Sequence, residues 1–209
     1  MQLIGMLDSP YVRRVAISLQ LLGLPFEHRS ISVFRQFDEF HRINTVVKAP
    51  TLVCDDGGVL MDSTLIIDYA EALAAPRSLM PHTLAGRQRS LALTGLALAA
   101  CEKSVQIIYE RNLRPAEKQH APWVERVRGQ LSAALAALEA EMARQPLACT
   151  ATDINQAGVT CAVTWHFLRE TLPELASASD HPALQAHSAC AETLPAFRNA
   201  PHGAGTVQH

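Results

Sequence analysis

The chain has 209 residues, of which 48% are hydrophobic and 18% charged, so it can form one large domain or two small ones. Its formal net charge of -2 and its lack of Lys or Arg runs give no electrostatic basis for binding nucleic acid or anionic lipid. Because no segment reaches the roughly 18 unbroken apolar residues of a membrane span and the N-terminus lacks a secretory pattern, we expect a cytoplasmic protein with no membrane partner.

The chain opens with a strand followed by a helix. Residues 2–7 (QLIGML) form a short apolar run, which predicts a strand. Ser9 and Pro10 follow at once, and they supply an N-cap and a first-turn proline. Gly23 provides the left-handed stop at the end of this helix.

Four further elements complete the first part of the chain. They are an alternating strand over 26–33, a short helix or irregular turn over 34–43, a β-hairpin over 51–61, and a helix that begins at Ser63. The predicted order is therefore β-α-β-α-β-β-α.

The rest of the chain shows no strand pattern. We expect a first domain over 1–76, a linker over 77–85 that contains proline, and a helical domain over 86–209. Within the last, the spacing of apolar residues predicts long helices over 86–112 and 124–142, a helix capped by Thr150 and Asp153 that starts near residue 151, and a short helix near 183–192. The tail over 200–209 (APHGAGTVQH) is expected to be loose or weakly ordered. Trp165 is expected in the helical core.

The cysteines and histidines show no metal or disulfide pattern. The five cysteines, at positions 54, 101, 149, 161 and 190, are odd in number, far apart and never in C-x-x-C spacing. We expect them to be reduced and mostly buried. The nine histidines lack metal-ligand spacing, so we expect surface or loop positions and no bound metal.

Two segments carry a family resemblance. They are SPYVRRVAISLQLLGLPFE, which begins at Ser9, and KAPTLVCDDGGVLMDSTLIIDYAE, which begins at Lys48. With these motifs the chain resembles the cytosolic glutathione S-transferases over nearly its whole length, and among them the bacterial proteins of the YibF type, which Arg114, Pro115 and Ala116 also favour. The resemblance implies a fold of the class α/β plus all-α, with a thioredoxin-like N-terminal domain and an all-helical C-terminal domain. It also implies glutathione as co-substrate and a homodimer.

The resemblance places the glutathione sulfur beside Ser9. At the start of a helix, the hydroxyl and the positive end of the dipole favour a thiolate. A free thiol has a pKa of about 8.5, so a depression of one or two units makes it substantially ionised at neutral pH. From the pattern alone Ser9 is an N-cap, and one residue can serve both purposes.

The resemblance also assigns the remaining contacts with glutathione. It makes Pro50 a cis-proline that lets the Ala49 backbone pair with the extended peptide, and it directs Asp62 and Ser63 toward the γ-glutamyl ammonium and carboxylate. Lys48 would reach the glycyl carboxylate, and Phe34 would contribute its backbone. Without the family match, a trans-proline, ordinary helix caps and a solvated lysine explain the same residues.

The motif departs from the family pattern at four positions, one of which is Ala49, where a larger aliphatic residue is usual but the expected contact uses the backbone. Thr45 and Val47 stand where many members have Pro and Gly, which leaves the shape of the loop before Pro50 open. Asp62 replaces the more usual Glu, one methylene longer, so the contact with the ammonium is expected to weaken.

A second-substrate pocket is implied next to the sulfur. Its candidate residues are Leu7, Tyr11, Val105, Ile108 and Tyr109, with Arg111 or Arg114 for an anionic group. Apolar residues at helical spacing belong to a core more often than to a pocket.

The leading hypothesis is a transferase that adds the glutathione thiolate to a small, mainly apolar electrophile. A glutathione-dependent isomerase and a non-catalytic binding or interaction protein are the alternatives. Ser rather than Cys at position 9 makes thiol–disulfide exchange less favoured.

Overall fold

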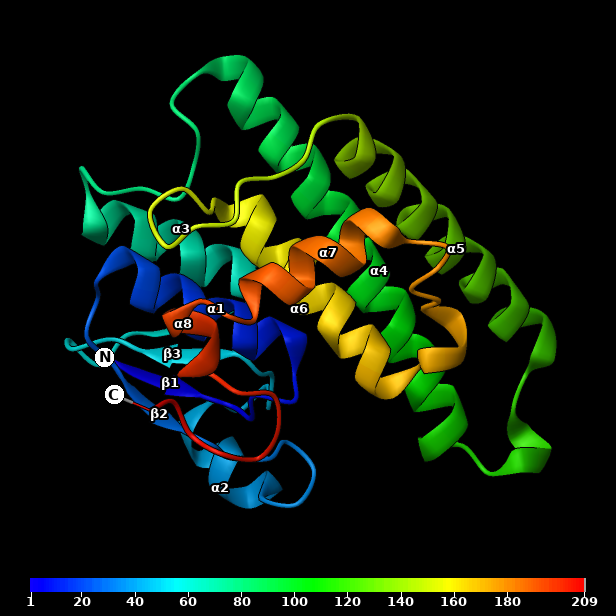
Figure 1. Ribbon diagram of the computed structural model, residues 1–209. Coiled ribbons are helices and arrows are strands. Elements are labelled where there is room, and N and C mark those ends of the chain that lie inside the picture. Colours follow the sequence, from blue (N-terminus) through cyan, green and yellow to red (C-terminus); the bar gives the residue numbers. More distant parts are fainter. Residues whose placement is uncertain (209) are drawn as a thin grey trace. The chain divides into compact units, whose positions relative to one another are not determined.

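The computed structural model describes residues 1–208, which form two compact units (Figure 1). The first unit contains residues 1–80, 150–152 and the chain from Glu192 onward, and the second contains residues 81–149 and 153–191. The chain therefore returns to the first unit at its C-terminal end. This differs from the expected division, in which all of 86–209 belonged to the helical domain.

A four-stranded sheet forms the centre of the first unit. Its strands, in the spatial order β2-β1-β3-β4, are β1 (Gln2–Ile4), β2 (Glu27–Arg29), β3 (Thr51–Val53) and β4 (Val59–Met61). β1 pairs in parallel with β2 and antiparallel with β3, which pairs antiparallel with β4. The helices are α1 (Pro10–Leu22), α2 (Phe37–Ile43) and α3 (Ser63–Ala74). Figure 1 shows α1 and α3 on one face of the sheet and α2 on the other. The predicted β-α-β-α-β-β-α order is confirmed.

The signals at the ends of α1 act as the sequence predicts. The Ser9 Oγ accepts a hydrogen bond from the Val12 N–H at 3.4 Å, and Gly23 adopts a φ of 72° at the C-terminal end. Val12, Val15 and Leu19 are fully buried, so α1 is held by core packing as well as by its caps. This fixes the position of Ser9 at the first turn.

Among its described residues, the second unit contains helices and no strand. Its elements are α4 (Leu84–Leu113), the 3-10 turn η1 (Ala116–Lys118), α5 (Ala121–Arg144), α6 (Gln156–Thr171), the 3-10 turn η2 (Pro173–Leu175) and α7 (Pro182–Ala191). α4 packs against α5 and α6, and α6 packs against α7. Trp165 is buried in this core, as predicted. α4 is long and apolar enough to cross a membrane, a property that core helices of soluble proteins share.

α6 begins later than the sequence predicted. Its N-cap is Asn155, whose Oδ1 accepts a hydrogen bond from the Gly158 N–H at 3.0 Å. The expected start near residue 151, with Thr150 and Asp153 as a capping box, is therefore wrong. Two capping patterns compete within a few residues, and the structure uses the asparagine, among the most favoured N-cap residues.

Two of the cysteines form a disulfide, contrary to the prediction. Cys149, after α5, is bonded to Cys190 in the last turn of α7, with Cα atoms 6.4 Å apart. Because the two residues are 41 positions apart in sequence, spacing alone does not reveal their pairing. Cys54, Cys101 and Cys161 are free and buried, and burial raises the pKa of the Cys161 thiol to about 12.

The segment from Glu192 is anchored to α1. Arg13, only 1% exposed, donates to both Glu192 carboxylate oxygens at 2.7 and 2.6 Å and from Nε to the Ala200 carbonyl at 2.8 Å. Phe197, in the short helix α8 (Pro195–Arg198), is fully buried, and the Arg13 guanidinium lies over its ring. The loose tail predicted for residues 200–209 is wrong for Ala200 and Val207, because both are buried and Ala200 accepts a hydrogen bond from Arg13.

A buried histidine holds the end of this segment. The Val207 N–H donates to Nδ1 of His28 at 3.1 Å, while Nε2 lies 2.7 Å from the Gly5 carbonyl oxygen. These contacts fit a neutral ring that carries its proton on Nε2. In the second unit, Nε2 of His187 lies 3.0 Å from the Gly158 carbonyl oxygen. The expectation of surface histidines is wrong for both, which are 7% exposed.

We expect the free energy of unfolding to fall as the pH drops below about 6.5. Burial lowers the pKa of His28 and His187, against the smaller effect of their backbone hydrogen bonds. The unfolded chain then binds more protons than the folded chain, so this stability is present above about pH 6.5, the unfolded pKa, and is lost below it. Urea denaturation at about pH 7.5 and about pH 5 measures the difference.

A pair of variants tests whether His28 contributes to this pH dependence of the free energy of unfolding. His28→Gln retains a hydrogen-bonding side chain that does not titrate, so the pH dependence should shrink. His82→Gln replaces an exposed histidine and should leave it unchanged. An unaltered pH dependence in His28→Gln would contradict the assignment.

Candidate functional site

The candidate site is built around the end of β1 and the start of α1. A Cβ placed on Gly5 would lie 2.7 Å from Val12 Cγ2 and 3.0 Å from the Cβ of Ala49, so the backbone here approaches both neighbours closely. Gly5 has a φ of 134°, which favours glycine. The loop before β3 is thereby brought against the first turn of α1.

Ser9 stands at the positive end of α1. Its backbone N–H donates to the Met6 carbonyl at 3.2 Å, and its own carbonyl accepts from the Arg13 N–H at 2.9 Å. Its hydroxyl oxygen accepts from the Val12 N–H, and this bond leaves the hydroxyl proton available for donation. The half-buried side chain is thus placed where a thiolate is favoured.

The loop before β3 keeps a defined shape despite its unusual sequence. The buried Asn44 donates to Thr51 Oγ1 at 2.8 Å and accepts from the Val46 N–H at 3.0 Å. Val47 adopts a φ of 53°, a conformation that glycine takes readily and that a β-branched residue rarely does. The Ala49–Pro50 peptide bond is cis, as the resemblance implies.

The start of α3 gathers the polar residues predicted for the γ-glutamyl end. Asp62 caps the helix, because its Oδ1 accepts from the Thr64 N–H at 2.9 Å. The other carboxylate oxygen of Asp62 lies 3.7 Å from Nζ of Lys48, and both side chains are partly exposed. Ser63 is only 3% exposed, and its Oγ accepts from Nη1 of Arg14 at 2.9 Å.

Arg14 belongs to this cluster, although the sequence interpretation missed it. Its side chain is buried, and Nη1 also donates to Thr64 Oγ1 at 3.3 Å. The available signal was an arginine beside Val12 and Val15 in a helix that is buried over most of its length. A charged residue at such a position requires polar partners.

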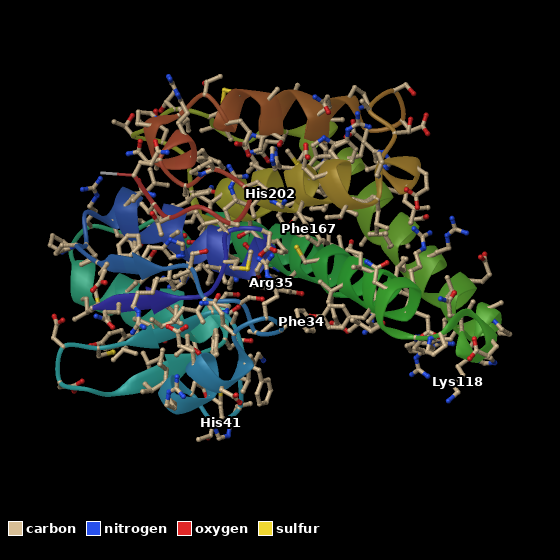
Figure 2. All side chains as sticks on the ribbon, turned by 90° about the horizontal axis from the view of Figure 1, so that it is seen from below. Phe34, Arg35, His41, Lys118, Phe167 and His202 are labelled. Atoms are coloured by element: carbon tan, nitrogen blue, oxygen red, sulfur yellow. A yellow bond between two sulfur atoms is a disulfide. The ribbon has the colours of Figure 1, made fainter. Side chains whose placement is uncertain are left out.

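The other predicted residues are more dispersed. Phe34 lies in the loop between β2 and α2 (Figure 2), is 58% exposed, and donates its backbone N–H to Ser32 Oγ at 3.3 Å. In the first unit Leu7 is fully buried and Tyr11 partly buried. On α4, Val105 and Ile108 are partly buried and Tyr109 is exposed.

The arginines proposed for an anionic substrate have carboxylate partners. Arg111 contacts Glu174 at 2.6 Å, and Arg114 contacts Glu110 at 2.7 Å. Over residues 1–208, no group of three His, Cys, Asp or Glu side chains is placed to hold a metal ion.

Comparison with protein families finds two matches. "Glutathione S-transferase, N-terminal domain" matches residues 3–78, and "Glutathione S-transferase, C-terminal domain" matches residues 121–190. The chain is 25% identical over 173 residues to the uncharacterized GST-like protein YibF of Escherichia coli, which covers 83% of this chain and 85% of that protein.

Solved structures of similar proteins contain glutathione or a derivative. A glutathione S-transferase of Methylobacterium radiotolerans in complex with glutathione sulfonate superposes with a TM-score of 0.87 at 25% identity, covering 95% of this chain and 93% of the other. A glutathione transferase family member of Pseudomonas fluorescens with bound glutathione gives a TM-score of 0.80 at 30% identity, over 94% and 96% of the chains.

Proposed function

Because this chain belongs to the glutathione S-transferase family, we propose that it binds glutathione, holds the sulfur as a thiolate beside Ser9 and adds it to a small, mainly apolar electrophile. The observation that carries the proposal is the start of α3, where Asp62 and Ser63 sit next to Lys48 and Arg14. Helix N-termini with a serine hydroxyl favour carboxylates, and the Asp62 carboxylate favours an ammonium group. These are the two charges of a γ-glutamyl group.

The extended tripeptide would follow the loop before β3. In this proposal the Ala49 backbone, preceding the cis-Pro50, pairs with the cysteinyl residue as an added strand would. Lys48 serves the glycyl carboxylate. Its contact with Asp62 is a solvent-exposed pair at 3.7 Å, and such pairs contribute about 0–1 kcal/mol, so Lys48 can turn to a ligand at small cost. The Phe34 backbone is the remaining candidate contact.

The chemistry would be carried by the ligand's own sulfur. The Ser9 hydroxyl donates to the sulfur and the positive end of α1 stabilises its negative charge, so the thiol proton passes to solvent near neutral pH. The thiolate then attacks an electrophilic carbon and a C–S bond forms, while the electron pair leaves with a leaving group or is protonated on the acceptor. No covalent enzyme intermediate is required.

The electrophile would contact exposed apolar surface. Tyr11 of the first unit remains a candidate because it is only partly buried, while Val105, Ile108 and Tyr109 of the second unit stay candidates from the sequence alone. Leu7 is withdrawn from this set, since it is fully buried.

A two-fold homodimer is part of the proposal. Val59 and Met61 on the edge strand β4 and Leu65 on α3 are exposed apolar side chains of the first unit, and a partner would cover them. Light scattering after size exclusion should give about twice the 22.7 kDa chain mass. A monomer mass at micromolar concentration would contradict it.

Calorimetric titration with reduced glutathione tests the function. Saturable binding is expected for the wild type. Ser63→Ala should bind about 10 to 100-fold more weakly, because a hydrogen bond to a charged group contributes about 1.5–3 kcal/mol. Ser78→Ala removes an exposed serine near the other end of α3 and should bind normally.

The outcomes separate the hypotheses. No binding at millimolar glutathione would remove the transferase proposal. Binding without a glutathione conjugate in mass spectra, across a panel of aromatic halides and enones, would leave a binding protein. Conversion of a substrate without consumption of glutathione would instead indicate an isomerase.

A further inference from the structure

The disulfide between Cys149 and Cys190 is accessible from solvent. Cys190, in the last turn of α7, is exposed, and Cys149, in the irregular segment between α5 and α6, is half-buried. Their Cα atoms are 6.4 Å apart, which is within the range that a disulfide requires. A disulfide is opened by a thiolate that approaches one of its sulfur atoms. An exposed cysteine therefore makes this bridge open to attack while the protein stays folded.

The bridge lies close to both places at which the chain leaves the second unit. Cys149 is the last residue before the chain enters residues 150–152 of the first unit, and Cys190 comes just before the second exit, at Ala191. The residue that follows this exit is Glu192, the carboxylate partner of Arg13. Because the bridge joins residues 41 positions apart, it restricts the unfolded chain, and opening it should lower stability.

The two sulfur atoms are not equivalent as targets. Cys190 lies at the negative end of α7, where a thiolate is disfavoured, whereas Cys149 lies beyond the last turn of α5. Sγ of Cys149 is 4.0 Å from the His187 carbonyl oxygen, which can accept from it once it is a thiol. Exposure and charge therefore both favour attack at Cys190 with the Cys149 sulfur as the leaving group.

The other three cysteines are in a different environment. Cys54, Cys101 and Cys161 are free and buried. Burial raises the pKa of Cys161 to about 12, so its sulfur is a thiol near neutral pH. Sγ of Cys101 lies 3.1 Å from Thr164 Oγ1 inside the helical core. These residues are internal controls, because a small thiol or disulfide does not reach them in the folded protein.

We propose that the Cys149–Cys190 bridge is a site of reversible modification by a small thiol of the glutathione class. The thiolate attacks Sγ of Cys190 and a new S–S bond forms there. The bond to Cys149 breaks, and its electron pair stays on the Cys149 sulfur, which takes a proton from solvent. Cys149 can then attack Cys190 and expel the small thiol, which closes the bridge again.

Full reduction needs a second molecule of the thiol. It attacks the sulfur of the bound small thiol and releases Cys190, so that the two cysteines are reduced and the two small thiols leave as one disulfide. The inference goes beyond the proposed conjugation reaction and does not rest on it, because exchange needs only a free thiol and an accessible bridge.

The experiment adds excess reduced glutathione to the intact chain, purified without reductant. Iodoacetamide stops the reaction and labels the thiols that have been released, and peptide masses locate both groups. We expect glutathione on Cys190, the label on Cys149 and neither on the three buried cysteines. The native protein should react within about 100-fold of the rate in urea. A bridge that opens only on unfolding would react at least about 1000-fold more slowly.

Thermal unfolding measures the consequence of opening the bridge. Full reduction should lower the unfolding midpoint by about 5–15 °C. Cys149→Ser lacks the bridge, so its midpoint should not respond to reductant. Cys54→Ser removes a buried cysteine outside the bridge and should keep the full response.

Three results would overturn the proposal. They are a native rate more than about 100-fold below the rate in urea, glutathione on Cys149 in place of Cys190, and cysteines 149 and 190 that stay free thiols after treatment with oxidised glutathione. Failure of the calorimetric titration with glutathione is a separate result, because it concerns the site at Ser9 and leaves exchange at the bridge unaffected.

Discussion

Replacing Glu192 with alanine is expected to lower the free energy of unfolding by about 3–5 kcal/mol. The substitution leaves the Arg13 guanidinium buried without the carboxylate that accepts from both of its Nη atoms. Removing one partner of a buried ion pair costs this much because the remaining charge stays desolvated. Glu192 is 25% exposed, which places the expected value toward the lower end.

Urea denaturation of three variants tests this expectation. Arg198→Ala removes an exposed arginine of the same C-terminal segment and should change stability by less than about 0.5 kcal/mol. The double variant Arg13→Met, Glu192→Leu replaces the pair with apolar side chains and should recover most of the loss. A Glu192→Ala protein as stable as Arg198→Ala would show that the pair does not anchor the segment.

Replacing Ser9 with alanine is expected to lower kcat/KM for conjugation about 10 to 100-fold near neutral pH. This result depends on the proposed function. Without the hydroxyl donor, the pKa of the bound thiol rises one or two units toward its free value of about 8.5, and the thiolate fraction falls accordingly. Ultraviolet titration of the bound thiolate measures the pKa directly.

Ser9→Ala also removes a helix cap, so a matched control is needed. Thr83 caps α4 in the same way, with its Oγ1 accepting from the Gly86 N–H at 3.1 Å. Thr83→Ala should cost a similar stability, about 1 kcal/mol, with no change in the thiol pKa. If Ser9→Ala left the bound thiol pKa unaltered, the activating role of Ser9 would be refuted.

Local signals made the first unit predictable. Ser9, Pro10 and Gly23 mark the ends of α1, and their effect depends only on residues within one turn. The alternation of strand and helix patterns gave the order of elements, and the step of three and four residues gave the long helices of the second unit. Such signals determine the type and the ends of a helix or strand from residues that are only a few positions apart.

Long-range pairings were not predictable. Arg13 and Glu192 are 179 positions apart, and Val207 meets His28 across the same separation. No periodic pattern marks residues 200–209, so the sequence suggested a loose tail there. The disulfide between Cys149 and Cys190 could not be predicted either, because the two residues are 41 positions apart.

The residues of the candidate site also divide into those marked by local sequence signals and those that depend on long-range contacts. Asp62 and Ser63 could be identified from the sequence because a cap and a helix start are local features. The cis-Pro50 was implied by the family motif. Arg14 was missed because its role depends on a contact across 49 positions. The positive φ of Val47 could not be expected from a valine.

Because the chain returns to the first unit at its C-terminal end, the two units can complete folding only in a fixed order during synthesis. Domains generally fold from the N-terminus as they leave the ribosome. Here the sheet and α1 emerge early, yet Glu192 and Phe197 are translated only after every helix of the second unit. Until then Arg13 lacks its carboxylate. The first unit is therefore completed last, and a nascent chain that stops before Glu192 contains a full helical unit beside an unfinished sheet unit.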